Sequence, residues 1–383
     1  MCSDRSGKEH TLIMPDTLCQ EPATEAESWK SAKRLYLLNP LKDPRWDGLL
    51  ARSPAASLFH STAWLEALRR TYGYECTAYT TSAPGKPLEN GLPFCRVDSW
   101  LTGRRLVSLP FSDHCALLAG NNEYLHDLIG ALQEESRKKR WRYIEMRPLE
   151  SLEAADRFCH PIATYTLHRL DLRPDLDTVF GRFHKDSIQR KIRRAEREGL
   201  TYAEGATESI FDAFYRLLVI TRRRHRVPPQ PREWFRNLAD CFGDDLKIRI
   251  ACKSGHPVAG MLTIRYKEAL VYKYGGSDAR FNNLGGMHLL YWRSIEDAKK
   301  SGLRVFDLGR SDADQTGLIT FKSRWGAAQS KLTYWRLTPS GNAQHIFDPA
   351  VRTWRTRVAK QVFSYAPARV LSALGTVLYK HIG

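Results

Sequence analysis

The sequence predicts a mixed α/β fold built from two related units. Short runs rich in β-branched and aromatic residues alternate along the chain with stretches of helical periodicity, a pattern typical of helices layered on mixed sheets. The chain has 383 residues, of which 42% are hydrophobic, so it can bury a sizeable core, and its length corresponds to about two or three domains. The order of predicted elements is similar in the two halves, although no sequence repeat accompanies it.

The first half opens with a strand at 34–38 and a helix at 61–71, which Gly73 ends. Three strands follow, with a Pro-Gly turn at 83–87 between them, and this turn indicates an antiparallel meander. A helix and a final strand complete the half. The three strands are predicted at 74–80, 91–97 and 104–109, the helix at about 122–140 and the final strand at 142–147.

The second half repeats the scheme, beginning with a strand at 163–171. Helical periodicity predicts helices at about 176–198, 207–226, 231–242 and 286–301. Alternating runs predict the remaining strands at 246–252, 257–266, 269–275, 303–308 and 331–337.

Both ends of the chain differ from these units. The first residues are polar and aperiodic, without the basic start and apolar stretch of a secretory signal, and predict a disordered leader. Residues 349–383 carry six Lys or Arg, no acid and helically spaced apolar side chains, as in a basic amphipathic tail. That tail either docks on the protein's own core or contacts a membrane. The predicted organisation is a leader at 1–32, units at 33–160 and 161–340, and a tail at 341–383.

Composition excludes several classes of protein. No apolar run approaches the roughly 20 residues that span a bilayer. The eight cysteines lie far apart without a C-x-x-C pair, which argues against zinc knuckles and thioredoxin-like sites. We expect no metal, and a reducing, cytoplasmic setting. The 59 Lys and Arg against 42 Asp and Glu leave a net charge of +17, which favours anionic partners such as a phosphorylated ligand, nucleic acid or an acidic membrane.

A glycine-rich turn is the first candidate for a site. A strand is predicted to end at Tyr274, two glycines allow a sharp turn, and a long helix begins near Gly285. The unpaired amides at such a helix start attract phosphate or a developing oxyanion. A glycine-rich turn without any ligand explains the same residues equally well.

The second candidate follows the strand predicted at 303–308. Asp307 and Arg310 come at the end of that strand, where functional side chains often lie. Gly317 lets the chain turn back, so that Phe321 and Lys322 approach the same edge. A cation that emerges from an apolar wall acts strongly on nearby charge. The alternatives are a solvated loop lysine and a strand-end aspartate with a structural role.

Five segments in order carry a family resemblance: F-H-S-T-A-W, I-R-R-A-E-R-E-G-L, Y-K-Y-G-G-S, F-D-L-G-R-S and G-L-I-T-F-K-S-R-W-G. Together they resemble the FemAB-like branch of the GNAT acyltransferases over about 34–338. The resemblance implies two GNAT-like units side by side, with a ligand cleft in or between them. Family members transfer acyl or aminoacyl groups to amines.

The resemblance implies direct attack of an amine on a thioester or ester carbonyl, so an oxyanion must be held and the amine must lose a proton. By similarity to the family's Phe-Lys pair, Lys322 stabilises the oxyanion and Phe321 shapes the pocket. Asp307 is the candidate that orients the amine or accepts its proton. Arg310 and Tyr272 are the candidates for binding the substrate.

The acyl donor is expected to be acyl-CoA, with aminoacyl-tRNA as the alternative. The residues assigned to it are Tyr274, Asn283, Gly285 and Gly286. The spacing departs from the family's phosphate-binding pattern, because Met287 occupies the position of the last small residue. The chain resembles a short branch without the coiled-coil arm of several tRNA-using members, which favours acyl-CoA.

The helix at 182–198 is strongly basic, and Arg190 and Arg194 lie on one of its faces with two other arginines. This face is either solvated or binds the phosphate of a lipid-linked or nucleotide-linked acceptor, or of tRNA. The leading hypothesis is a cytoplasmic N-acyltransferase that modifies an amine of a cell-envelope or polysaccharide precursor, with peripheral membrane contact through 349–383. The alternative is a non-catalytic GNAT-fold module that binds nucleic acid or anionic lipid.

Overall fold

The computed structural model describes residues 35–100, 103–118, 123–152, 159–339, 375 and 377–381, without the side chains of 123–127. The predicted leader and most of the predicted tail lie outside these residues. Within the part described, no helix is both long and apolar enough to cross a membrane.

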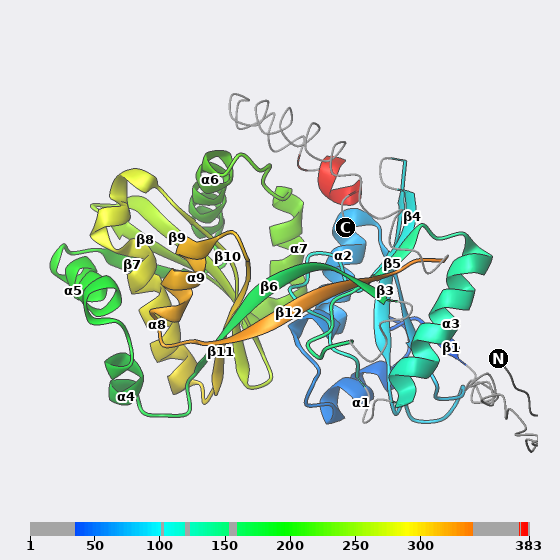
Figure 1. Ribbon diagram of the computed structural model, residues 1–383. Helices are drawn as coiled ribbons and strands as arrows, with labels where there is room; N and C mark the ends of the chain where they lie inside the picture. The colour runs from blue at the N-terminus through cyan, green and yellow to red at the C-terminus, as the bar shows by residue number, and fades with distance from the viewer. Residues whose placement is uncertain are drawn as a thin grey trace, which may run out of the picture. The chain divides into compact units, whose positions relative to one another are not determined.

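The first unit begins with a short strand and two helices, followed by a three-stranded meander, a long helix and a last strand (Figure 1). Ser61 caps the second helix by accepting a hydrogen bond from the Trp64 amide, and Gly73 ends it in the left-handed conformation, as predicted. The elements are β1 (Tyr36–Leu38), α1 (Arg45–Arg52), α2 (Thr62–Tyr72), β2 (Glu75–Thr80), β3 (Leu92–Ser99), β4 (Gly103–Val107), α3 (Glu123–Lys139) and β5 (Tyr143–Met146).

The second unit begins with a long strand, and its own meander is again followed by a helix and a strand. Its first elements are β6 (Cys159–Asp171), α4 (Leu176–Gly181), α5 (Arg190–Arg197), β7 (Thr201–Gly205), α6 (Glu208–Arg224) and α7 (Arg232–Phe242). Its later elements are β8 (Leu246–Lys253), β9 (His256–Tyr266), β10 (Ala269–Ser277), α8 (Gly286–Lys300), β11 (Val305–Asp312), α9 (Thr316–Ser323) and β12 (Ala328–Leu337).

The described strands form one mixed sheet in the order β1-β2-β3-β4-β5-β12-β6-β11-β10-β9-β8-β7. The last strand, β12, pairs with β5 on one side and with β6 on the other, and so joins the two units in one sheet. Figure 1 shows β12 in orange beside β6 in green where the units meet. The mixed α/β class and the paired units of the prediction are confirmed.

Both units share one topological feature. In each, the last strand of the meander pairs in parallel with the strand that follows the next helix: β4 with β5, and β10 with β11. The ladder between β10 and β11 is short, because it ends at the pair Val271 and Asp307 although both strands continue. The predicted end of β10 at 274–275, with a sharp turn at the two glycines, is wrong, since this strand runs on to Ser277.

Three other expectations need correction. A loop was expected at 316–323, because Thr316, Gly317 and the β-branched residues that follow have low helix propensity. In the structure these residues form helix α9. The helix predicted at 176–198 is interrupted by a π-helical turn at Lys185–Gln189 and is divided into α4 and α5. Helix α1 and strand β7 were not predicted.

A continuous core crosses the boundary between the units. Helices α2 and α7 pack together there, as Figure 1 shows. The rings of Trp64 and Trp234 meet edge to face with centroids 5.2 Å apart. Both side chains are fully buried, and burial of such rings is the main source of packing energy in a core. This shared core joins the two units.

Candidate functional site

Lys322 lies on α9 with its ammonium buried. The side chain is 2% exposed, and Nζ donates hydrogen bonds to the carbonyl oxygens of Gly309 and Arg310 at 2.9 and 3.0 Å. Burial lowers the pKa of this lysine to about 8, against the attraction of Asp113 and Asp307. An ammonium has three donors, so these two bonds leave one N–H direction for another acceptor.

Asp307 stands at the end of the ladder between β10 and β11. Its Oδ1 accepts a hydrogen bond from the Gly309 amide at 2.8 Å, and its Oδ2 accepts one from Arg169 Nε at 3.2 Å. His114 Nε2 lies 3.8 Å from the same Oδ2. Burial raises the pKa of Asp307, but His114, Arg169 and the Gly309 amide together outweigh it and hold the pKa at about 2. The carboxyl is therefore ionised near neutral pH and is a weak proton acceptor.

A loop of the first unit supplies a second carboxylate. Asp113 Oδ1 accepts a hydrogen bond from Lys273 Nζ at 3.0 Å, and Arg310 Nε lies 4.0 Å from the same oxygen. Lys273 is buried against the rings of Phe59 and Trp64. Burial lowers the pKa of Lys273, and Asp113 acts in the opposite direction.

The loop that carries Asp113 and His114 is strained. Leu109 and Phe111 both have positive φ, at 55° and 60°, which is uncommon for residues with a side chain. Backbone strain of this kind is often found at functional sites. The sequence analysis missed Asp113, His114 and Lys273. For Asp113 and His114, the sequence offered one signal: the segment L-P-F-S-D-H places them shortly after a predicted strand, as Asp307 and Arg310 are placed at the end of another.

Arg310 is fixed by aromatic rings. Its guanidinium lies over Tyr165, 4.0 Å from the ring centroid, and 5.2 Å from that of Tyr334. The Tyr334 hydroxyl donates to the Asp113 carbonyl at 2.7 Å. Stacking on aromatic faces and a nearby carboxylate are favourable for a guanidinium. The structure thus brings Arg310, Asp307 and Lys322 together, as expected.

Phe321 and Tyr272 belong to an aromatic cluster beside this charged centre. The ring of Tyr291, on α8, lies 5.6 Å from that of Phe321 and 5.3 Å from that of Tyr272. Trp325 stacks on Tyr291 at 5.1 Å. The cluster provides an apolar wall next to the helix that carries Lys322.

Asn283, Gly285 and Gly286, which were assigned to the cofactor, lie at or just before the start of α8, whereas Tyr274 does not join them. Tyr274 lies in the core, where its hydroxyl accepts a hydrogen bond from Trp234 Nε1 at 2.8 Å. Asn283 is exposed, and its carbonyl accepts a hydrogen bond from Lys191. A bulge between Tyr272 and Tyr274 changes the register of β10, and their rings pack against α8 and α7 respectively.

The two glycines at the start of α8 meet protein, not open space. A Cβ on Gly285 would lie 2.5 Å from the Lys191 carbonyl oxygen, and one on Gly286 would lie 3.0 Å from the Ala259 Cβ. Close packing of α5 and β9 against α8 thus accounts for both glycines. These glycines do not fit an open phosphate cradle.

The basic face of α5 is directed to solvent. Arg190 is exposed with Asp186 3.7 Å away, and Arg194 is half-exposed with Glu198 3.5 Å away. Neither arginine belongs to the group around Lys322, which consists of Gly309, Arg310, Asp113, Asp307 and Lys273. Their expected role in binding a substrate phosphate stays a prediction.

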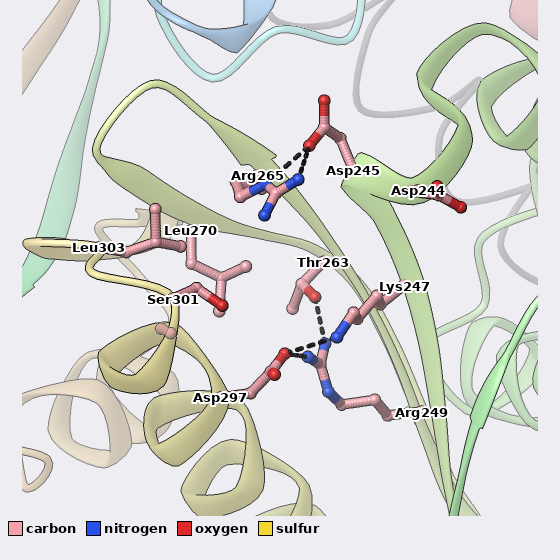
Figure 2. Close-up of a pocket in the computed structure, with 11 residues that line it drawn as sticks. Asp244, Asp245, Lys247, Arg249, Thr263, Arg265, Leu270, Asp297, Ser301 and Leu303 are labelled. Carbon is pink, nitrogen blue, oxygen red and sulfur yellow. Dashed lines mark hydrogen bonds and ion pairs between the residues drawn. The ribbon is translucent and has the colours of Figure 1, made fainter.

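Figure 2 shows a separate pocket, between β8, β9 and α8, whose charges are balanced. Arg249 is fully buried and donates to Asp297 and to the Thr263 hydroxyl. Asp297 also accepts from Lys247, and Arg265 pairs with Asp245. Cations and carboxylates thus compensate each other in this pocket, which is typical of a structural network. No group of three or more His, Cys, Asp or Glu side chains that could hold a metal occurs in the described part.

Comparisons with known proteins agree with this fold. Residues 182–323 match the family model of the acetyltransferase (GNAT) domain. No curated protein sequence is significantly similar to the chain. The crystal structure of FemX superposes with a TM-score of 0.60 at 14% identity, covering 75% of this chain and 94% of FemX.

Two further solved structures are similar. A C-terminal domain assigned to a lysylphosphatidylglycerol synthetase from Agrobacterium fabrum gives a TM-score of 0.52 at 14% identity, covering 82% of this chain and 94% of that domain. A tandem GNAT protein from the clavulanic acid biosynthesis pathway gives a TM-score of 0.50 at 13% identity, covering 80% of this chain and 99% of that protein. At these identities the likeness establishes a shared fold.

Proposed function

We propose that this chain, a member of the GNAT acyltransferase superfamily with the fold of its FemAB-like branch, is an N-acyltransferase that modifies an amine of a cell-envelope or polysaccharide precursor. The observation that carries the proposal is the buried ammonium of Lys322 at the end of the short β10–β11 ladder. An alternative is a non-catalytic module of the same fold that binds nucleic acid or anionic lipid.

Lys322 is proposed to stabilise the oxyanion. When an amine attacks the carbonyl of an activated acyl group, negative charge develops on the carbonyl oxygen. The Gly309 and Arg310 carbonyls orient Nζ by two hydrogen bonds, and the remaining N–H is available to donate to that oxygen. A preorganised donor in a site of low dielectric constant lowers the barrier more than the same donor does in water.

Asp307 is proposed to orient the attacking amine and to hold the local structure. Its pKa of about 2 makes it a poor general base, because an efficient base has a pKa near the working pH. Its bond to the Gly309 amide also fixes the turn whose carbonyl binds Lys322. Phe321 and Tyr272 supply the apolar wall beside the acyl group, and Arg310 supplies positive charge for a phosphate or carboxylate of the substrate.

Acyl-CoA is the proposed donor, with aminoacyl-tRNA as the alternative. The GNAT domain match supports an acyl donor in general. The packing of Gly285 and Gly286 against α5 and β9 gives no support for pyrophosphate at the predicted position. The acceptor is proposed to be a phosphorylated or lipid-linked amine, and the lysylphosphatidylglycerol synthetase assignment of one structural neighbour is consistent with a lipid substrate.

The test is acyl transfer by purified protein to amine acceptors, with acetyl-CoA, longer acyl-CoA and aminoacyl-tRNA as donors. Lys322→Ala should reduce kcat by about 10²- to 10³-fold, as for loss of an oxyanion donor, while circular dichroism shows an unchanged fold. Lys299→Ala, on α8, is the matched control and should keep activity. Full biological activity of the Lys322→Ala protein would instead support the non-catalytic module.

A further inference from the structure

A second pocket, beside α9, differs from the one in Figure 2 in its charge. It is an open depression of about 430 Å³ lined by Arg182, His184, Ile319, Thr320, Ser323, Arg324 and Gln329. Two arginines line it and no carboxylate does. The Figure 2 pocket, in contrast, has three acidic residues beside its three basic ones. Uncompensated arginines in a concave site attract an anion.

The pocket is held in shape by the backbone and by a buried ring pair. The His184 amide donates to the Arg324 carbonyl at 2.9 Å, which ties the two arginine-bearing segments together. Each arginine is followed directly by a buried aromatic residue, and these rings, Phe183 and Trp325, meet with centroids 5.0 Å apart. The two guanidinium groups therefore start from fixed backbone positions on neighbouring segments.

Neutral donors complete the lining. Ser323 Oγ accepts a hydrogen bond from Gln329 Nε2 at 2.7 Å and donates to the Ile319 carbonyl, so both side chains are oriented. Thr320 adds a hydroxyl one turn away on the same helix. Asp171 interacts electrostatically with Arg182, but both of its carboxylate oxygens accept hydrogen bonds from Arg173. No ion pair involves Arg182 or Arg324 among the residues that the structure describes.

We propose that this pocket binds the phosphate group of a phosphorylated substrate. Guanidinium groups bind phosphate oxygens through charge-assisted and often bidentate hydrogen bonds, and the hydroxyl of Thr320 adds a donor. The proposal rests on the proposed transferase function, because the same helix α9 presents Lys322 on another of its faces. His168 lies between the two sites, since its Nε2 is 3.3 Å from Ser323 Oγ and its ring is within electrostatic reach of Lys322.

This position constrains the substrate. Thr320 and Ser323 of the pocket and Lys322 belong to the same two-turn helix, so one extended molecule can reach both places. The ligand class is therefore a phosphate ester whose reacting group is several bonds away from the phosphate. Both an acyl-CoA donor and a nucleotide-linked acceptor have this character.

The experiment measures thermal unfolding of the full chain with inorganic pyrophosphate as probe, at constant ionic strength set with sodium chloride. A ligand of the native state raises the unfolding midpoint with concentration. The midpoint should rise for the wild type and for Arg304→Ser, an exposed arginine elsewhere in the second unit. It should rise much less for Arg182→Ser and Arg324→Ser. An equal rise in all four proteins overturns the proposal.

A second arm repeats the titration with CoA and with a uridine diphosphate sugar. The compound that no longer stabilises the Arg324→Ser protein is the one whose phosphate binds in the pocket. Loss of the effect of CoA indicates the acyl donor, and loss of the effect of the uridine diphosphate sugar indicates the acceptor. In the transfer assay, Arg324→Ser should raise KM for that compound at least tenfold and leave kcat nearly unchanged. If pyrophosphate binds independently of Arg324 while Lys322→Ala abolishes transfer, the pocket proposal fails alone. If pyrophosphate binding requires Arg324 while Lys322→Ala leaves transfer unchanged, the proposed function fails and the pocket proposal stands.

Discussion

The ammonium of Lys273, on β10 of the second unit, donates a hydrogen bond to Asp113 Oδ1, in a loop of the first unit, at 3.0 Å. Both side chains are largely buried. This ion pair brings residues 160 positions apart into one charged centre, together with Asp307, Arg310 and Lys322. The candidate site is consequently built by both units, although the GNAT domain match covers residues of the second alone.

Removing one member of this pair should destabilise the protein. Asp113→Asn or Lys273→Met leaves a buried charge without its partner, which costs about 3–5 kcal/mol. The double variant should lose much less than the sum, because neither charge remains. Urea unfolding of the four proteins measures the coupling.

Glu268→Gln is the control for the charge pair, since Glu268 and Arg304 form an exposed ion pair at 3.2 Å. It should change the free energy of unfolding by less than about 1 kcal/mol. Strictly additive losses for Asp113→Asn and Lys273→Met would show that the two side chains do not interact in solution.

Activity should decline at alkaline pH through deprotonation of Lys322. The proposed oxyanion donor is the protonated form, which predominates below the pKa of about 8. Activity attributable to this group is therefore present below pH 8 and falls by up to about tenfold per unit above it. Lys322→Arg should remove this alkaline decline, because a guanidinium stays charged throughout the range. An identical profile in that variant would assign the decline to another group.

Gly309→Ala tests the contact between Gly309 and Asp113. Gly309 has a φ of 70°, and a Cβ there would lie 3.1 Å from Asp113 Oδ2. Gly302→Ala is a matched control with a φ of 74° and no atom within 4 Å of the added carbon. Both variants should lose about 1–2 kcal/mol from backbone strain.

Gly309→Ala alone should also move the Asp113 carboxylate and the carbonyl that binds Lys322. We expect kcat to fall more than tenfold in this variant and to stay near the wild-type value in Gly302→Ala. Equal kcat values would mean that the position of Asp113 does not affect the reaction.

Gly285→Ala tests whether that glycine serves packing. With a φ of 82°, its added Cβ would meet the Lys191 carbonyl oxygen at 2.5 Å, whereas Gly199, with a φ of 67°, has no atom within 4 Å. Gly285→Ala should therefore lower the unfolding midpoint clearly more than Gly199→Ala, because α5 must move away from α8. Similar midpoints would indicate that this contact is loose, and an open cradle for phosphate would regain support.

Much of the fold could be predicted from local pattern. The strands of both meanders and the helices that end at Gly73 or begin near Gly286 have clear periodicity, and the structure confirms them. Helix α9 could not be recognised in this way, since Thr316 and Gly317 have low helix propensity and resemble a turn. The structure also corrects the continuous helix at 176–198, where a π-helical turn separates α4 from α5.

The sequence by itself determined the fold class and the basic charge, which follow from element order and composition. It also supplied Asp307, Arg310 and Lys322 as candidates, from strand ends, an apolar run that ends in a lysine and the family resemblance. Only the tertiary structure decided that Asp113, His114 and Lys273 join them, and that Tyr274, Gly285 and Gly286 pack in the protein interior. The reason is physical: which side chains share a low-dielectric space depends on how distant segments pack, and local periodicity carries no information about that packing.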